Sequence, residues 1–188
     1  HTRFAPVDNN LYPAGFNNIC ALDLNICAER LQTYILEHAP QAKHVGIIPE
    51  SHTKNKFYLD HLATLASCLN KNFSKVSIIS PDVELFMDAQ KENLLNPEGH
   101  LELTSQSNQT IVIEPVSIKN GRLCSQDGSF VDVIILNHDQ SKPLPVQWSQ
   151  VQQQLVMPSP KLGWTARQKI KHFQYYQEVT DDFCQYFK

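Results

Sequence analysis

The strongest constraint on the fold is a strand–helix–strand pattern between residues 44 and 80. Two short apolar runs, "HVGIIP" (44–49) and "KVSIIS" (75–80), are typical of buried strands. Between them, residues 55–70 repeat apolar side chains at helical spacing. Strands joined by such a helix are usually parallel, because the crossover brings the chain back in the same direction. The pattern therefore predicts a parallel pair inside an α/β sheet.

Other segments extend this unit. They predict a helix over 21–39, a β-hairpin over 100–105 and 110–118, a strand over 131–136, a short helix near 146–154 and a helix from Trp164 to Phe187. The expected fold is a three-layer α/β domain with a mostly parallel, Rossmann-like sheet and an inserted β-hairpin. A plain doubly wound domain without the hairpin is the alternative. Residues 1–20 are expected to form an ordered loop or arm, and residues 21–188 a single domain.

Charge and composition narrow the class of partner. A formal net charge of −3 argues against nucleic acid, since no basic excess is present to neutralise phosphates. No apolar run approaches the roughly 20 residues of a membrane span. The five cysteines are odd in number and form no CxxC pair, which favours free thiols in a reducing cytoplasm over disulfides or a metal site.

Several catalytic and nucleotide-binding fingerprints are absent from the chain. There is no GxGxxG, no GxxxxGK[ST] and no GxSxG, so the sequence has no dinucleotide loop, phosphate loop or nucleophile elbow. Ser51 and His52 are adjacent, and a hydrolase that uses them is a third interpretation. Neighbouring side chains rarely point at each other, so adjacency does not make a nucleophile–base pair.

Polar turns follow the predicted strands, at the edge where parallel sheets bind ligands. The turns are "PESHTKN" (49–55), "SPDVE" (80–84) and "NHDQSKP" (137–143). We expect two of these turns to bring together Glu50, Ser51, His52, Thr53, Lys54, Asn55, Asn137, His138 and Asp139. The start of the following helix also favours an anion there. The structural alternative is that Thr53 or Asn55 caps the helix, His52 is an exposed loop residue and Asp139 orients a turn.

The last predicted helix and the opening loop offer further cations and amides. Arg167 and Lys171 are four residues apart on one helix face, with Trp164 one turn earlier. Their repulsion would be offset by a bound carboxylate or phosphate, and a solvated basic face is the alternative. The opening loop contributes Arg3, and amides that include Asn10 and Asn18, if its aromatic residues fold back on the domain. Disorder is the alternative for this loop.

Four segments carry a resemblance to a known family. "TRFAPVDNNLYPAGFNN", "IPESHTKNKFYLDHLATL", "VIILNHDQS" and "LGWTARQKIKHF" resemble, in this order, segments of the proteobacterial type 3 glutamate–cysteine ligases. The likeness runs from Thr2 to about Phe187. It implies the N-terminal, pre-ATP-grasp portion of an enzyme that makes γ-glutamylcysteine, the first step of glutathione synthesis. The family's ATP-grasp-like C-terminal half would follow Lys188 and contact this chain.

The resemblance implies ATP and Mg²⁺ as cofactors, bound mainly outside this chain, and glutamate and cysteine as substrates. The residues implied in substrate binding are Arg3, Asn10, Asn18, Glu50, His52, Lys54, Asn55, Asn137, Asp139, Trp164, Arg167 and Lys171. Among them, cations would meet carboxylate or phosphate, and Glu50 or Asp139 would hold an ammonium group. Catalysis would depend on positioning and charge, without a protein nucleophile.

The chain also departs from the family pattern. The family favours Arg where Lys54 stands, Asn where His138 stands and a small polar residue where Ile170 stands. The alternative function is a non-catalytic module that binds a small anionic metabolite or a partner protein.

Overall fold

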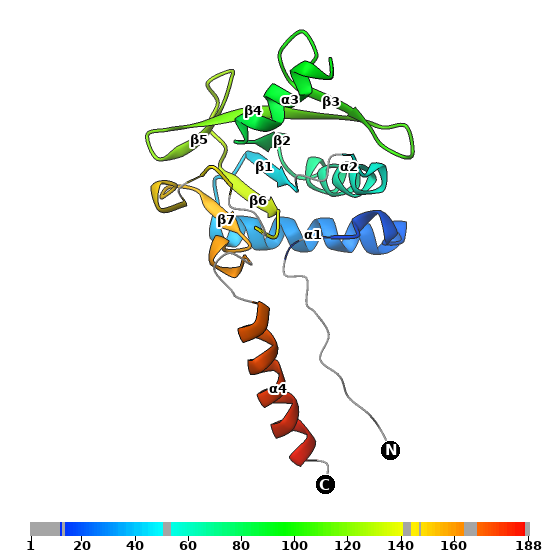
Figure 1. Ribbon diagram of the computed structural model, residues 1–188, viewed down its shortest axis with the longest axis vertical. Helices are drawn as coiled ribbons and strands as arrows, with labels where there is room; N and C mark the ends of the chain where they lie inside the picture. Colours follow the sequence, from blue (N-terminus) through cyan, green and yellow to red (C-terminus); the bar gives the residue numbers. More distant parts are fainter. Residues whose placement is uncertain are drawn as a thin grey trace.

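The computed structural model describes residues 12, 14–50, 54–140, 144–146, 148–163 and 169–186 (Figure 1). The helices are η1 (Phe16–Asn18), α1 (Ala21–His38), α2 (Lys56–Asn70), α3 (Val83–Lys91), η2 (Trp148–Gln150), η3 (Pro160–Leu162) and α4 (Lys169–Gln185). The strands are β1 (His44–Pro49), β2 (Lys75–Ser80), β3 (Leu101–Thr104), β4 (Thr110–Lys119), β5 (Arg122–Ser125), β6 (Val133–Asn137) and β7 (Leu155–Met157).

The strands form one sheet of seven, in the order β3-β4-β2-β1-β6-β7, with β5 paired to β4. β1 runs parallel to both β2 and β6, and the β2–β4 and β6–β7 pairs are also parallel. β3 and β5 each pair with β4 in antiparallel fashion, and β3–β4 is the predicted hairpin. The mostly parallel sheet with an inserted hairpin is thus confirmed. Its parallel strands direct their carboxyl ends toward one edge.

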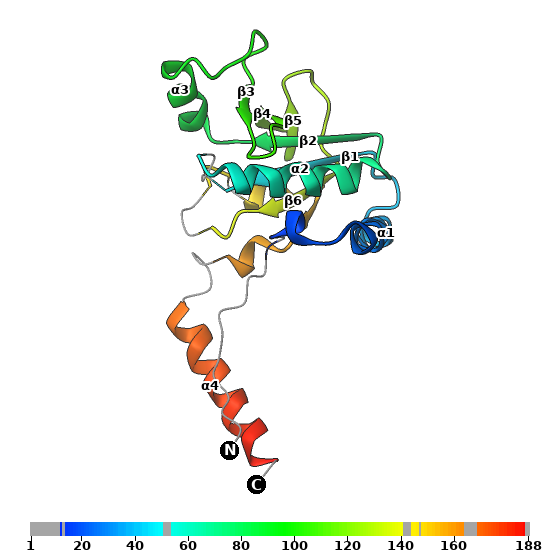
Figure 2. The ribbon, with the colours of Figure 1, turned by 90° about the vertical axis from the view of Figure 1, so that its right-hand side faces the viewer.

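The central strands are covered on both faces, which explains why they read as continuous apolar runs. β1 and β6 are buried along their whole length. On one face, α2 packs Leu59, Leu62 and Leu65 over the sheet, and α1 packs beside α2 (Figure 2). On the other face, a separate apolar cluster joins the sheet to β5 and to segment 144–156. This second face is therefore covered by the antiparallel β4–β5 pair and by irregular chain.

The predicted and observed elements differ mainly where an element is short or lies at an edge of the sheet. The predicted helix near 146–154 is reduced to the single turn of η2, and β7 follows it. β5 and β7 have four and three residues, too few to display an alternating pattern. α4 stands apart from the sheet in Figure 1 and Figure 2. Among the described residues, no helix combines the length and apolar character needed to cross a membrane.

Gln154 replaces a missing strand partner beside β5. Its Oε1 accepts the backbone N–H of Leu123 at 2.7 Å, and its Nε2 donates to the Leu123 carbonyl at 3.1 Å. Its Nε2 also donates to the carbonyl of Val131. Leu123 and Val131 are fully buried, so water cannot replace these bonds without opening the core.

We expect Gln154→Ala to lower the free energy of unfolding by about 1–3 kcal/mol, because it leaves the buried Leu123 N–H without an acceptor. Chemical denaturation monitored by circular dichroism would measure the change. Gln153→Ala is the matched control: Gln153 is exposed, and its loss should change stability by less than about 0.5 kcal/mol. Equal effects of the two substitutions would contradict the assigned role of Gln154.

His44, at the start of β1, makes stability depend on pH. Its ring is buried between the Phe130 carbonyl and the Ser77 hydroxyl, each 3.2 Å away. Burial, and next the nearby Lys75, lower the pKa of His44 below its ordinary value of 6.5. The folded state therefore binds fewer protons here than the unfolded state, so this group stabilises the fold above pH 6.5 and loses that contribution as pH falls.

We expect the wild-type chain to lose stability between about pH 7.5 and pH 5.5, and His44→Gln to lose less over the same interval. Denaturation at the two pH values would measure both slopes. His38→Gln, at an exposed histidine of α1, is the control and should keep the wild-type slope. An unchanged slope in His44→Gln would show that His44 does not carry the effect.

Candidate functional site

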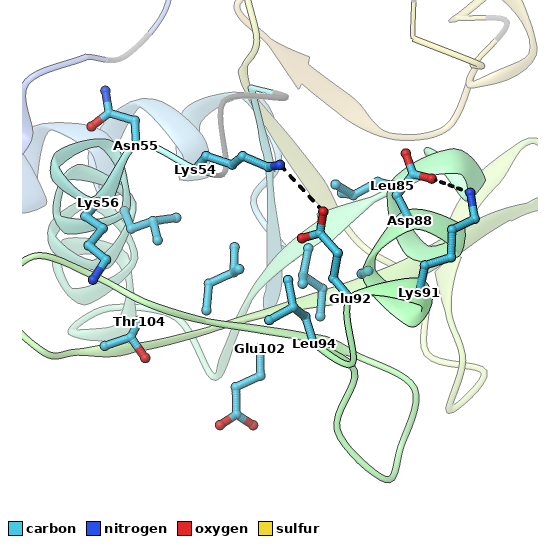
Figure 3. Close-up of a pocket in the computed structure, with 14 residues that line it drawn as sticks. Lys54, Asn55, Lys56, Leu85, Asp88, Lys91, Glu92, Leu94, Glu102 and Thr104 are labelled. Atoms are coloured by element: carbon cyan, nitrogen blue, oxygen red, sulfur yellow. Dashed lines mark hydrogen bonds and ion pairs between the residues drawn. The ribbon is translucent and has the colours of Figure 1, made fainter.

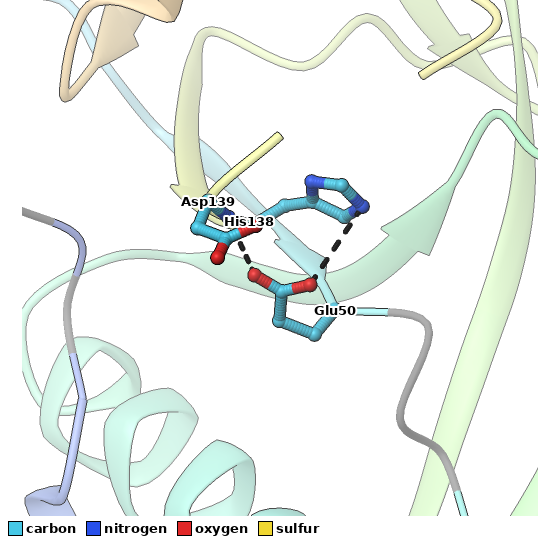
Figure 4. A group of neighbouring side chains, drawn as sticks. All are labelled: Glu50, His138 and Asp139. Atoms are coloured by element: carbon cyan, nitrogen blue, oxygen red, sulfur yellow. Dashed lines mark hydrogen bonds and ion pairs between the residues drawn. The ribbon is translucent and has the colours of Figure 1, made fainter. Parts of the chain in front are cut away.

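A carboxylate, a histidine and an aspartate meet where β1 and β6 end (Figure 4). Pro49 and Asn137 are register partners at these ends, so the residues that follow them emerge together. Oε1 of Glu50 accepts the backbone N–H of Asp139, and Oε2 of Glu50 lies 3.8 Å from Nε2 of His138. The Glu50 side chain is 18% exposed, whereas that of His138 is 5% exposed. We call Glu50, His138 and Asp139 the Glu50 clamp.

The proton on His138 can be placed from its hydrogen bond. Nδ1 of His138 accepts the backbone N–H of Gln140 at 2.9 Å. Nδ1 therefore carries a lone pair, and the proton of the neutral ring sits on Nε2, which faces Glu50. The Asp139 N–H is hydrogen-bonded to one carboxylate oxygen of Glu50, and Nε2 of His138 lies beside the other.

The same bond bears on whether the Glu50 clamp holds a metal ion. Ligand atoms of the three residues lie within 4.8 Å of one another, close enough to surround a cation. A histidine ligand must offer a lone pair, however, and Nε2 of His138 carries a proton in this tautomer. As arranged, the Glu50 clamp does not fit a metal that needs His138. It fits a cation that brings its own hydrogens, such as an ammonium group.

Gln140 holds His138 in place and is itself held by a close approach to Gly163. Gln140 has φ of 56°, a left-handed conformation that a non-glycine residue adopts only when its surroundings stabilise it. A Cβ added to Gly163 would lie 2.7 Å from Cβ of Gln140. Residue 163 therefore has to be glycine for the end of η3 to approach the loop after β6. This contact packs against Gln140, the residue whose N–H binds His138.

On the helix face of the same strand ends, Tyr58 and His61 of α2 converge on Asn137. The Tyr58 hydroxyl donates to Oδ1 of Asn137 at 2.6 Å and accepts the backbone N–H of Glu50 at 2.7 Å. Nε2 of His61 lies 3.2 Å from the same Oδ1, and Nδ1 of His61 accepts the backbone N–H of Phe16 at 3.1 Å. We call Tyr58, His61 and Asn137 the Tyr58 network. It joins β1, β6, α2 and η1.

Burial keeps the Tyr58 hydroxyl protonated. The pKa of Tyr58 is raised far above its ordinary value, first by burial and then by the nearby Glu50 carboxylate, while the Glu50 N–H opposes this shift. Tyr58 is therefore always a donor to Asn137 at physiological pH. The direction of the hydrogen bond from Tyr58 to Asn137 therefore does not change when other groups of the site gain or lose a proton.

Lys54 and Asn55 lie on another side of this edge. Oδ1 of Asn55 accepts the backbone N–H groups of Phe57 and Tyr58, which is the N-cap of α2. Nζ of Lys54 lies 3.5 Å from Oε1 of Glu92, with its side chain 90% exposed. Both residues line a cavity of about 1490 Å³ between α2, α3 and β3 (Figure 3). Leucine side chains line this cavity together with charged groups of both signs.

The structure brings together only some of the predicted site residues. Glu50 and Asp139 meet in the Glu50 clamp, as expected from adjacent strand ends, and Asn137 lies at the end of β6 in the Tyr58 network. Asn18 is exposed at the end of η1, and Lys171 is exposed on α4. The predicted residues outside the described part of the chain are Arg3, Asn10, His52, Trp164 and Arg167, together with Ser51 and Thr53. Their roles remain predictions, as do those of Lys54 and Asn55.

Sequence reasoning missed Tyr58 and His61. Tyr58 shares the helical spacing of Leu62 and Leu65, and this spacing alone predicts a core residue. A signal was present: Tyr58 and His61 are three apart, so they share one helix face and place two polar tips beside the strand ends. A tyrosine and a histidine within an otherwise apolar stripe need hydrogen-bond partners when buried.

A family model and a solved structure both match this chain over nearly its whole length. The family model GshA, described as glutamate-cysteine ligase, matches residues 1–188. A search of curated proteins found no match. A crystal structure of a provisionally assigned gamma-glutamylcysteine synthetase from Methylobacillus flagellatus KT is similar, with a TM-score of 0.72 and 30% sequence identity. The alignment covers 96% of this chain and 39% of that chain, so this chain spans well under half of its structural relative.

The tautomer of His138 can be measured directly. At about pH 8, above the ordinary histidine pKa of about 6.5, we expect long-range ¹H–¹⁵N spectra to show His138 protonated on Nε2. His38 is the internal control, because its Nδ1 lies 2.8 Å from the Tyr34 carbonyl and must carry the proton there. Addition of Mg²⁺ or Zn²⁺ should leave the His138 signals unchanged. Proton loss from Nε2 on addition of metal would instead assign the Glu50 clamp to a metal ion.

Proposed function

The chain belongs to the glutamate–cysteine ligase family, and from this we propose that it is the substrate-binding portion of an ATP-dependent enzyme that forms γ-glutamylcysteine. The reaction joins the γ-carboxyl group of glutamate to the amino group of cysteine. The observation that carries the proposal is the Glu50 clamp, a carboxylate held at the carboxyl edge of a parallel sheet. A family that acts on two amino acids needs such a site for an ammonium group.

An α-amino acid presents an ammonium group and at least one carboxylate, and the chain offers groups for both. Glu50 and Asp139 are the acceptors for the ammonium group. Lys54 and Lys171 are exposed cations in the described part of the chain, and Arg3 and Arg167 are further cations in its sequence. We propose that these cations hold substrate carboxylates or phosphate. Asn10, Asn18, Asn55, Asn137, His52 and Trp164 complete the proposed substrate-binding set.

We propose that ATP and Mg²⁺ bind mainly outside the described residues. The sequence contains no glycine-rich phosphate loop, and the Glu50 clamp as arranged does not supply a histidine ligand. ATP would supply the energy for forming the amide bond. This chain's residues would bind and orient the amino acids, and a dry, charged pocket would stabilise the reacting groups. In this proposal, no side chain acts as a covalent nucleophile.

We further propose that the rest of the protein contacts this domain, and that the enzyme works in the cytoplasm. The structural relative is longer than this chain, which covers 39% of it. α4 leaves Ile170, Tyr175 and Val179 at least 65% exposed, which is unusual for large apolar side chains on one helix. All five cysteines are free thiols, the form that a reducing compartment such as the cytoplasm maintains.

Calorimetric titration of the 188-residue chain with L-glutamate and with L-cysteine tests the substrate site. We expect one of the two to bind, and Glu50→Gln to weaken its binding about 10- to 100-fold, because the substitution removes a charge-assisted bond to the ammonium group. Glu98→Gln is the matched control, since Glu98 is exposed and lies outside the clamp. Equal binding by Glu50→Gln and wild type would remove Glu50 from the site.

Activity is tested with the full-length protein encoded by the gene. We expect ADP release that requires both amino acids, and a product with a γ-glutamyl bond. Absence of such release would contradict the ligase. Amino-acid binding without any turnover would instead favour the alternative function, a non-catalytic module for a small anionic metabolite.

A further inference from the structure

The Glu50 backbone and the Glu50 side chain are held from opposite faces of the sheet. The clamp holds the carboxylate on the face away from α2, through the Asp139 N–H and His138. The Tyr58 hydroxyl holds the Glu50 N–H on the face of α2. One phenolic oxygen thus connects the end of β1 with Oδ1 of Asn137 at the end of β6.

Each hydrogen of the Tyr58 network can be assigned from its partners. The Glu50 N–H occupies the Tyr58 oxygen as donor, so the Tyr58 proton points to Oδ1 of Asn137. The Phe16 N–H occupies Nδ1 of His61, so the His61 proton sits on Nε2 and also points to that oxygen. The Asn137 oxygen therefore receives two donors. Its amide orientation is fixed, and rotation would bring its NH₂ group against both of them.

These bonds are buried and cannot be exchanged for water at low cost. His61 and Asn137 are each 4% exposed. Breaking one bond would leave a buried polar group without its partner, which is costly enough to keep the unit in one arrangement. The Tyr58 network also contacts η1. The N–H of Phe16 in η1 donates to the His61 ring, and the centroid of the Phe16 ring lies 5.8 Å from the centroid of the His61 ring.

We propose that Tyr58 and His61 are positioning residues that fix Glu50 for binding the ammonium group of the substrate. The inference rests on the function proposed above. Tyr58 sets the position of the Glu50 backbone, and His61 fixes the Asn137 oxygen on which Tyr58 depends. Neither residue needs to touch the ligand. Nε2 of His61 binds Asn137, whereas Nδ1 of His61 binds the Phe16 N–H of η1. The two bonds of His61 therefore have separable roles.

Substitutions at His61 separate these two bonds. The amide nitrogen of glutamine can take the place of Nε2, so His61→Gln keeps a donor for Asn137 and loses the acceptor for Phe16. The amide oxygen of asparagine can take the place of Nδ1, so His61→Asn does the reverse. We expect His61→Gln to bind the amino acid within about twofold of wild type and to expose the Phe16 amide to hydrogen exchange. We expect His61→Asn to weaken binding about 3- to 10-fold while Phe16 stays protected.

Tyr58→Phe removes only the bridging hydroxyl. We expect its dissociation constant for the amino acid to rise about tenfold, and the Asp139 amide resonance to move because the Glu50 carboxylate shifts. Tyr34→Phe is the matched control, since the exposed Tyr34 hydroxyl lies on α1, and it should change neither quantity. Thermal unfolding of every variant, read beside the binding data, identifies any variant that loses binding only because it is unfolded.

The outcomes distinguish this inference from the proposed function. If wild type binds neither amino acid, the proposed function fails, and the Asp139 amide in Tyr58→Phe still decides whether Tyr58 positions Glu50. If wild type binds and a folded Tyr58→Phe binds equally well with an unmoved Asp139 amide, the positioning role is overturned. Identical behaviour of His61→Gln and His61→Asn would also overturn it, since a merely structural histidine would not separate the two substitutions.

Discussion

The candidate site depends on the register between β1 and β6. Pro49 lies opposite Asn137 and Ile48 opposite Leu136, so equivalent positions of the two strands point to the same face of the sheet. Glu50 and His138 consequently leave their strands on one face, and Asn137 lies on the other. A slip of one residue would reverse the faces of one strand and separate Glu50 from His138. The apolar residues of both strands hold this register, because each is buried on its own face.

Glu50 is bound by groups from both faces of the sheet. On one side, α2 offers a tyrosine whose hydroxyl accepts the Glu50 N–H, and on the other side the loop after β6 offers the Asp139 N–H. A carboxylate at a strand end would otherwise be able to rotate toward water. Holding both its backbone and its side chain limits this freedom before any ligand binds, and such preorganisation reduces the cost of binding.

Much of this arrangement could be predicted from the sequence, because periodicity identifies long elements. The strands around residues 44–49 and 75–80, and their parallel pairing, follow from apolar runs joined by a helix, and the meeting of Glu50 with Asp139 follows from adjacent strand ends. The use of each polar group could not be predicted. Asn55 caps α2, and Lys54 reaches Glu92, which follows α3, a helix that was not predicted from the sequence. Tyr58 looked like a core residue because its ring fits an apolar stripe and only its hydroxyl is used.

The choice between an ammonium group and a metal ion is decided by protons rather than by distance. The Glu50 clamp gathers three side chains at a spacing that a metal could accept. Each metal ligand must donate a lone pair, and the Gln140 N–H directs the lone pair of His138 to Nδ1, away from Glu50. Gly163 permits the close approach of the chain to Gln140, which has a left-handed conformation. A glycine outside the site thus helps to set the tautomer of His138, and that tautomer makes the carboxylate a partner for a hydrogen-bearing cation.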